Sequence, residues 1–180
     1  GKKAFVDEFL KPLGAKFLAT ERVRVVGKNA ILVNLDAAPK IPFDGAEVEA
    51  HAGGGWVKVE KRRDGLYVDG RKVALYLSER QKNGKVIQGH ELREELSEKP
   101  VLNANILDAL YEHPELIPED WKKDENGNVR YIFFWGTIYR DSRGGFYVRY
   151  LFFLGGEWGR DYVWLDYGWY GVNPAALRAS

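Results

Sequence analysis

The chain has 180 residues, of which 45% are apolar and 29% charged, a composition typical of a globular protein rather than a disordered or fibrous one. It contains no cysteine, which excludes disulfides, thiolate metal sites and cysteine nucleophiles. Lys and Arg number 27 and Asp and Glu 26, so the net charge indicates neither a nucleic-acid nor a membrane partner. At this length we expect residues 1–180 to form a single domain, with a subdivision into 1–77 and 90–180 as the alternative.

The apolar runs are too short for a membrane-spanning helix, which needs about 18–20 residues. We therefore expect a cytoplasmic protein. Because the chain opens on Gly1 and has no methionine, removal of a signal peptide stays open as the alternative.

The N-terminal part of the chain combines one amphipathic segment with several short strands. Ala4 to Leu13 carries apolar residues at helical spacing and predicts a helix. Arg22 to Val26 and Ala30 to Leu35 flank a glycine-containing turn, which predicts a hairpin with a short bulged loop. Trp56 to Lys61 alternates apolar and charged residues and predicts the first strand of a meander that ends near Leu77.

The centre of the chain is polar and then helical. Ser78 to Gly89 resembles a linker, and His90 to Leu96 predicts a short helical turn. Asn103 is a suitable N-cap for a helix over Ile106 to Tyr111, which Pro114 would end. Asn105 is an equally suitable cap.

The C-terminal part is rich in aromatic residues, since 16 of the 25 Phe, Tyr and Trp residues lie in 129–170. Val129 to Arg140, Phe146 to Leu154 and Trp158 to Tyr167 have the composition of long strands. Glycine-containing turns at 141–145 and 155–156 separate them. These runs predict consecutive antiparallel strands.

The turn at Gly155 and Gly156 predicts the register of the last two strands. A two-residue hairpin loop there places Leu151 opposite Arg160 and Arg149 opposite Tyr162. One face of the two strands then holds the candidate binding residues, which are Tyr147, Arg149, Arg160, Tyr162 and Trp164. The opposite face is richer in aliphatic residues, and we expect it to be the core face.

Arg, Tyr and Trp together are enriched at binding hot spots, which makes this Arg/aromatic face the candidate contact site. A structural interpretation stays open, because aromatic residues favour strands and arginine stems cover apolar surface. Arg149 and Arg160 would repel each other unless an acidic group lies between them. That group is either internal, with Glu157 or Asp166 as candidates, or belongs to a partner. An internal acid would make Arg149 structural, whereas an external one would make it a contact residue.

Catalytic motifs are weak. The sequence has no G-x-S-x-G nucleophile elbow and no phosphate-binding loop. His90 and Glu94 have the spacing of a surface pair on a helix, and 124–128 reads as a polar turn rather than a calcium loop. Asp161 falls on the expected core face, where it would have a raised pKa or pair with a buried arginine. The sequence therefore favours a non-catalytic protein with no cofactor and no metal site.

These observations predict an α+β fold dominated by antiparallel β-meanders, with an N-terminal helix and a short central helical segment. The favoured function is a binding or regulatory module that uses the Arg/aromatic face, with a protein partner or self-association. Two alternatives remain, a small enzyme or carbohydrate-binding protein with a cleft between the two halves, and a single-stranded nucleic-acid binder. Nucleic acid is disfavoured by the near-neutral charge, and no membrane partner is expected.

Eight blocks of the sequence carry a resemblance to a known group of proteins. The blocks are PLGAK (12–16), RVRVVGKNA (22–30), LYLSERQKNGKV (75–86), GHELREEL (89–96), LNANILDAL (102–110), HPELIPEDWKKDENGN (113–128), FFWGTIYRDS (133–142) and PAALRAS (174–180). They resemble a family of short uncharacterised proteins from small-genome candidate bacterial phyla. The resemblance covers nearly the whole chain and implies a natural bacterial protein, but it implies no functional residue.

Overall fold

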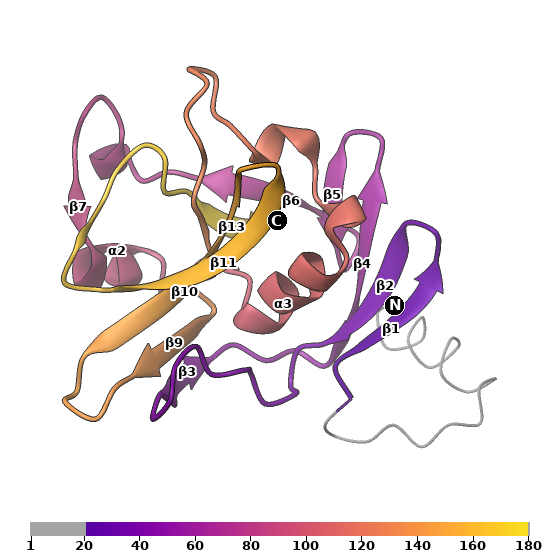
Figure 1. Cartoon of the computed structure of the whole chain (residues 1–180), viewed down its shortest axis with the longest axis horizontal. Helices are drawn as coiled ribbons and strands as arrows, with labels where there is room; N and C mark the ends of the chain where they lie inside the picture. The colour runs from indigo at the N-terminus through magenta and orange to yellow at the C-terminus, as the bar shows by residue number, and fades with distance from the viewer. Residues whose placement is uncertain (1–20, 180) are drawn as a thin grey trace.

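The computed structural model describes residues 21–179 (Figure 1). The strands of the first half are β1 (Val23–Gly27), β2 (Ala30–Asn34), β3 (Glu47–His51), β4 (Trp56–Arg62), β5 (Gly65–Val68), β6 (Arg71–Tyr76) and β7 (Ile87–Gln88). Those of the second half are β8 (Ile132–Phe133), β9 (Thr137–Arg140), β10 (Phe146–Leu154), β11 (Glu157–Trp164), β12 (Gly168–Trp169) and β13 (Ala175–Arg178). The helical elements are α2 (Gly89–Glu95), α3 (Ala104–Glu112) and the 3-10 turns η2 (Glu79–Gln81), η3 (Pro114–Leu116) and η4 (Glu119–Trp121).

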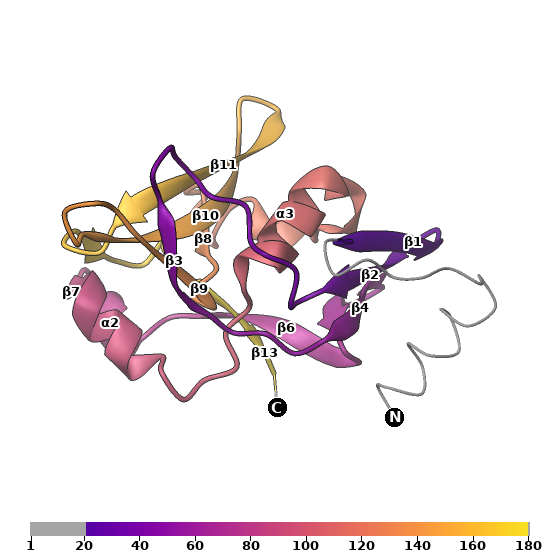
Figure 2. The ribbon, with the colours of Figure 1, turned by 90° about the horizontal axis from the view of Figure 1, so that it is seen from below.

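Eleven of the strands join in one mixed sheet. Its order is β1-β2-β4-β5-β6-β13-β8-β10-β9-β3, and β11 pairs with the remaining edge of β10. Near the end of the chain, β13 runs antiparallel to β6 and parallel to β8. It thereby joins the strands of the first half to those of the second. β7 and β12 form a separate two-stranded sheet beside α2 (Figures 1 and 2).

The predicted fold class, α+β with antiparallel meanders, is wrong. One large mixed sheet dominates, and residues 21–179 contain only two α-helices, both short. The prediction failed because local patterns indicate which neighbouring strands pair, but not that β13 inserts between β6 and β8. The expected helix over Ala4 to Leu13 lies outside the described residues.

Several local predictions are confirmed. β1 and β2 form the bulged hairpin, with the register shift between Val25 and Gly27. β4, β5 and β6 form the meander. β10 and β11 pair in the predicted register, from Leu154 opposite Glu157 to Tyr147 opposite Trp164. The long run over 129–140 differs, because it divides into β8 and β9, which both pair with the other edge of β10.

The central helix begins after the first of the two candidate cap asparagines, Asn103, and Asn105 lies inside it. The Asn103 side chain accepts hydrogen bonds from the backbone N–H groups of Asn105 and Ile106, which satisfies donors that the first turn leaves free. The Asn103 amide also donates to the Ala52 carbonyl at 2.8 Å, so the same residue attaches α3 to the end of β3. Every residue from Ala104 to Leu110 is buried.

Ser78 to Gly89 was expected to be linker-like, but it begins with the 3-10 turn η2, at which Ser78 and Gln81 are buried. Ser78 and Gln81 form a capping box around η2. The Gln81 amide donates to the carbonyls of Tyr170 and Asn173, which attaches this turn to the C-terminal part of the chain.

The core lies on both faces of β10 and β11. On one face Leu151 packs in a cluster with residues of α3 such as Ile106 and Leu110. On the other face Val148 packs in a second cluster with Leu92 of α2. The Arg/aromatic face is therefore also part of the core, because α3 covers it in part.

Gly136 lies between β8 and β9, at a close approach to the residues that precede α3. Its N–H donates to the Leu102 carbonyl at 2.9 Å, and a Cβ at this position would lie 2.8 Å from Asn103 Cα. Because backbone must shift to admit a methyl group, Gly136→Ala should reduce the free energy of unfolding by about 1–3 kcal/mol, measured by urea denaturation. Gly27→Ala is the control, since its nearest neighbour would be 3.9 Å away. Equal losses in the two variants would refute this close approach.

Candidate functional site

The five candidate residues share one face of β10 and β11, as the register requires. Arg149 lies opposite Tyr162, Tyr147 opposite Trp164, and Arg160 opposite Leu151. α3 packs against this face through contacts with both strands. The structure therefore keeps the predicted residues on one face but covers part of that face.

Asp108 of α3 holds both arginines. Arg149 donates from Nη1 to Asp108 Oδ2 at 2.9 Å and from Nη2 to Oδ1 at 2.8 Å. Arg160 donates from Nη1 to Asp108 Oδ1 at 2.7 Å. The bridging acid is thus internal, but it is neither Glu157 nor Asp166, the two residues that the sequence suggested.

The two hydrogen bonds between Arg149 and Asp108 are buried, and only 6% of Arg149 is exposed. Burial by itself lowers the pKa of Arg149, but the hydrogen bonds and the charge of Asp108 outweigh burial and raise it. Removing one partner from a buried ion pair typically costs about 3–5 kcal/mol, because the other charge is left uncompensated. Arg149 is therefore a structural residue of this face.

The connection from β2 to β3 crosses the same face and divides it. The Phe43 ring centroid lies 5.1 Å from those of both Tyr147 and Tyr162. The buried Tyr139 hydroxyl donates to the Lys40 carbonyl at 2.8 Å, which fixes the connection in place. On either side of Phe43 the surface is hollowed, and the predicted residues are distributed between two hollows.

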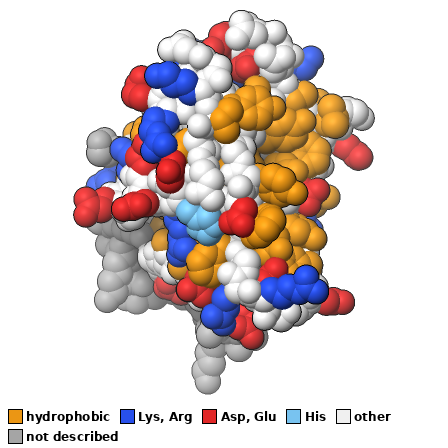
Figure 3. Space-filling view, turned by 90° about the vertical axis from the view of Figure 1, so that its left-hand side faces the viewer, with side chains coloured by type: hydrophobic (Ala, Val, Ile, Leu, Met, Phe, Trp, Pro, Cys, Tyr) orange, Lys and Arg blue, Asp and Glu red, His pale blue; other side chains and the backbone are white. Residues whose placement is uncertain are grey.

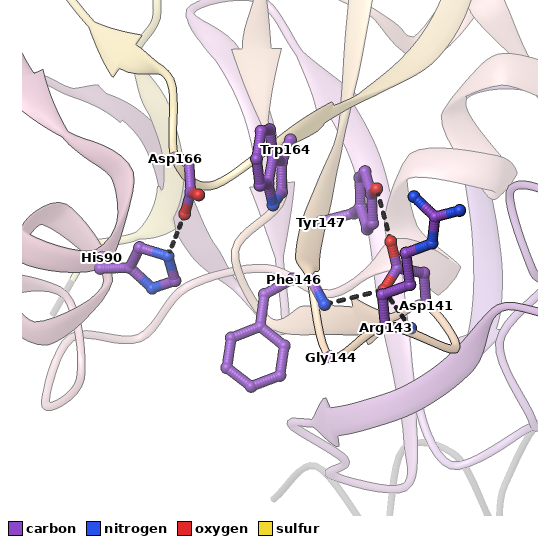
Figure 4. A pocket seen from close by; sticks show the side chains of 9 residues that line it. His90, Asp141, Arg143, Gly144, Phe146, Tyr147, Trp164 and Asp166 are labelled. Atoms are coloured by element: carbon purple, nitrogen blue, oxygen red, sulfur yellow. Dashed lines mark hydrogen bonds and ion pairs between the residues drawn. The ribbon is translucent and has the colours of Figure 1, made fainter.

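The first hollow, here called the Trp164 hollow, has a volume of about 400 Å³. It lies where the β9–β10 turn, the end of β11 and the start of α2 meet (Figure 4). The side chains that line it are those of His90, Asp141, Arg143, Phe146, Tyr147, Trp164 and Asp166. In Figure 4, Trp164 stands between His90 and Asp166 on one side and Tyr147 and Asp141 on the other.

Both polar pairs of the Trp164 hollow are held by hydrogen bonds. The Tyr147 hydroxyl donates to Asp141 Oδ2 at 2.8 Å, and the Gly145 N–H donates to Asp141 Oδ1 at 2.7 Å. The Tyr147 hydroxyl is the main cause that lowers the pKa of Asp141, and the same bond raises the pKa of Tyr147. On the other side, His90 Nε2 and Asp166 Oδ1 are 2.8 Å apart.

Trp164 offers both an aromatic surface and a free donor. The residue is 39% exposed, and its indole N–H has no hydrogen-bond partner among residues 21–179. Tyr167 packs edge-on against it at 6.0 Å between ring centroids. On the molecular face shown in Figure 3, hydrophobic side chains gather to one side of a histidine, with acidic and basic groups around them.

The second hollow, here called the Arg160 hollow, has a volume of about 290 Å³. It is lined by Lys40, Ile41, Pro42, Arg149, Arg160, Asp161 and Tyr162. The predicted contact residues are therefore separated, with Tyr147 and Trp164 at the first hollow and Arg149, Arg160 and Tyr162 at the second.

Sequence reasoning missed several of these contacts. His90 pairs with Asp166, 76 residues away, rather than with Glu94. Asp161 was expected on a buried face, but it is exposed. One available signal was Asp108, a single charged residue inside the apolar run of α3, since a charge at such a position needs a buried partner. No comparable signal marked Phe43.

Comparison of the chain with known protein families, curated proteins and solved structures found no match. The resemblance to the candidate-phyla family stays a prediction. Within residues 21–179, no group of three or more His, Asp or Glu side chains could hold a metal ion. The helices in this range are also too short or too polar to cross a membrane.

The lowered pKa of Asp141 predicts a pH dependence. Because its folded pKa lies below the ordinary value of 3.8, ionised Asp141 stabilises the fold at neutral pH, and this contribution is lost as the pH falls below about 4. Tyr147→Phe removes the main cause of the shift. Its melting temperature should therefore be lower than that of the wild type at pH 7, and the difference should narrow toward pH 2.5.

Tyr162→Phe is the control, because Tyr162 also contacts Phe43 but its hydroxyl has no hydrogen-bond partner among the described residues. The difference in melting temperature between Tyr162→Phe and the wild type should not change between pH 7 and pH 2.5. If the melting-temperature difference between Tyr147→Phe and the wild type is also independent of pH, the Tyr147 hydroxyl does not stabilise the Asp141 carboxylate.

Proposed function

We propose that the protein is a non-catalytic binding module and that its ligand is a carbohydrate bound in the Trp164 hollow. The observation that carries this proposal is the exposed Trp164 ring between two polar pairs that each contain a carboxylate. The hollow's volume of about 400 Å³ lies within the range of small-molecule sites.

The aromatic part of the hollow suits the apolar part of a sugar. The C–H groups of a pyranose ring form a weakly polar face that packs on an aromatic ring, while its hydroxyls point outward. Trp164 supplies a large, rigid surface for such packing at low entropic cost.

The polar part suits the hydroxyls, which both donate and accept hydrogen bonds. Asp166 is an acceptor, and the Trp164 indole N–H and the exposed Arg143 guanidinium are donors. Asp141 is held by three donors, namely the Tyr147 hydroxyl and the N–H groups of Arg143 and Gly145. Because Asp141 and Asp166 are already oriented by hydrogen bonds, these two carboxylates need little ordering on binding.

The same features argue against the alternatives. A single-stranded nucleic acid stacking on Trp164 would bring phosphates near Asp141 and Asp166, which would repel them. A hydrolase using a covalent intermediate needs an activated nucleophile. The lining side chains offer no serine, threonine or lysine, and the carboxylates that serve glycosidases as nucleophiles are already hydrogen-bonded, Asp141 to three donors and Asp166 to His90. The hollow also lies at one end of β10 and β11 rather than in a cleft between 1–77 and 90–180.

Binding can be tested by saturation-transfer NMR with a panel of methyl glycosides, followed by calorimetry on those that respond. We expect at least one glycoside to bind with a Kd between about 1 µM and 1 mM, or about 4–8 kcal/mol. Trp164→Ala should weaken binding at least about tenfold, which corresponds to 1.4 kcal/mol. Loss of the ring removes the packing surface, so the effect should not depend on which hydroxyl pattern is recognised.

Tyr167→Ala is the matched control, since Tyr167 is an exposed aromatic residue beside Trp164 that does not line the hollow. It should bind the same glycoside within a factor of two or so of the wild type. The proposal fails if no glycoside binds at 10 mM or so, or if Trp164→Ala and Tyr167→Ala bind equally well. Binding of single-stranded DNA that weakens with salt and requires Trp164 would favour the nucleic-acid alternative.

A further inference from the structure

We propose that the Arg160 hollow is a second binding site and that it takes an oxyanion, either a carboxylate or a phosphate group, held by Arg160. This inference does not depend on sugar binding, because it concerns different residues on the other side of Phe43. The supporting observation is an excess of positive charge around Asp108.

Two guanidinium groups share one carboxylate. Arg149 uses both of its terminal nitrogens on Asp108, and Arg160 shares the same Oδ1 oxygen at 2.7 Å. The cluster therefore carries one positive charge more than its single acid can neutralise. Lys40 at the same hollow pairs with Glu112 at 2.8 Å, so this second pair leaves the excess unchanged.

Arg160 is the residue that presents this excess to solvent. Only its Nη1 is bonded to Asp108, and its Nε and Nη2 groups have no acceptor among residues 21–179. The side chain is 32% exposed at the hollow, in contrast to the buried Arg149. An arginine with free N–H groups on one edge can bind a planar or tetrahedral oxyanion through two parallel hydrogen bonds.

The guanidinium is also held in position. Its central carbon lies 4.0 Å from the centroid of the Tyr111 ring, and its Nη1 is fixed on Asp108. A side chain that is already oriented loses less entropy when it binds, so the free N–H groups are prepared for a ligand. A solvent-exposed arginine without such partners would lose more side-chain entropy on binding the same ligand.

The walls of the hollow define what can carry the oxyanion. Ile41, Pro42 and the 37% exposed ring of Tyr162 provide an apolar surface next to Arg160. Strand alternation directs the Asp161 side chain to the opposite face of β11 from Arg160 and Tyr162. The ligand is therefore a small molecule with one anionic group and an apolar body, since the apolar walls offer few polar partners.

Inorganic phosphate and acetate are the probes for the two possible groups. Each is titrated against the ¹⁵N-labelled protein at constant ionic strength, with chloride replaced by the probe, and the Arg160 Nε–H signal is followed by NMR. We expect a saturable shift with a Kd in the millimolar range for phosphate, acetate or both. A lower Kd for phosphate assigns the site to phosphorylated ligands, and a lower Kd for acetate assigns it to carboxylic acids.

Arg160→Gln removes the charge and the fork, and Arg63→Gln removes an exposed arginine on the β4–β5 turn as the control. For these variants the Tyr162 and Ile41 amide signals report binding. Arg160→Gln should raise the Kd at least tenfold, and Arg63→Gln should leave it unchanged. If Arg160→Gln does not fold, Arg160→Lys is measured instead; it keeps the positive charge but loses the two-donor edge, and it should raise the Kd several-fold. The absence of a saturable shift with either probe, or equal Kd values in the variant and the control, would overturn the proposal.

Discussion

The buried contact between Asp108 and Arg149 is the interaction on which the arrangement of this protein depends. It joins the middle of α3 to the middle of β10, two elements that are 41 residues apart in the sequence. A guanidinium buried to this extent is tolerated only with a hydrogen-bonded counter-charge, so α3 cannot shift along β10 without exposing or isolating it. The pair thereby fixes which part of the Arg/aromatic face is covered and which part remains open.

The two hollows follow from this partial cover. α3 packs over the middle of the face, and the β2–β3 connection packs Phe43 against the touching rings of Tyr147 and Tyr162. Tyr147 lines one hollow and Tyr162 lines the other, so this three-ring cluster separates the two hollows. β10 can support this arrangement because it pairs along both edges and carries core residues on both faces. A strand with so many constraints is a rigid base for binding groups.

The sequence was informative where the controlling interactions are local. Gly155 and Gly156 determine the β10–β11 turn and, with it, the register of the two strands. Asn103 caps the N-terminus of α3. Three features were not local. The insertion of β13 between β6 and β8, the pairing of Asp108 with Arg149 and the position of Phe43 all join segments that are distant in the chain. Periodicity and turn residues do not encode such contacts, which explains why the candidate residues were found while their division into two hollows was not.

A double-mutant cycle on Asp108 and Arg149 tests the central claim most directly. Urea denaturation would give the free energy of unfolding for Asp108→Ala, for Arg149→Ala and for the double variant. Each single change should cost about 3–5 kcal/mol because it isolates the other charge, and the double variant should cost far less than the sum of the two. Additive losses, or single losses below about 1 kcal/mol, would contradict the conclusion that this pair holds α3 to β10.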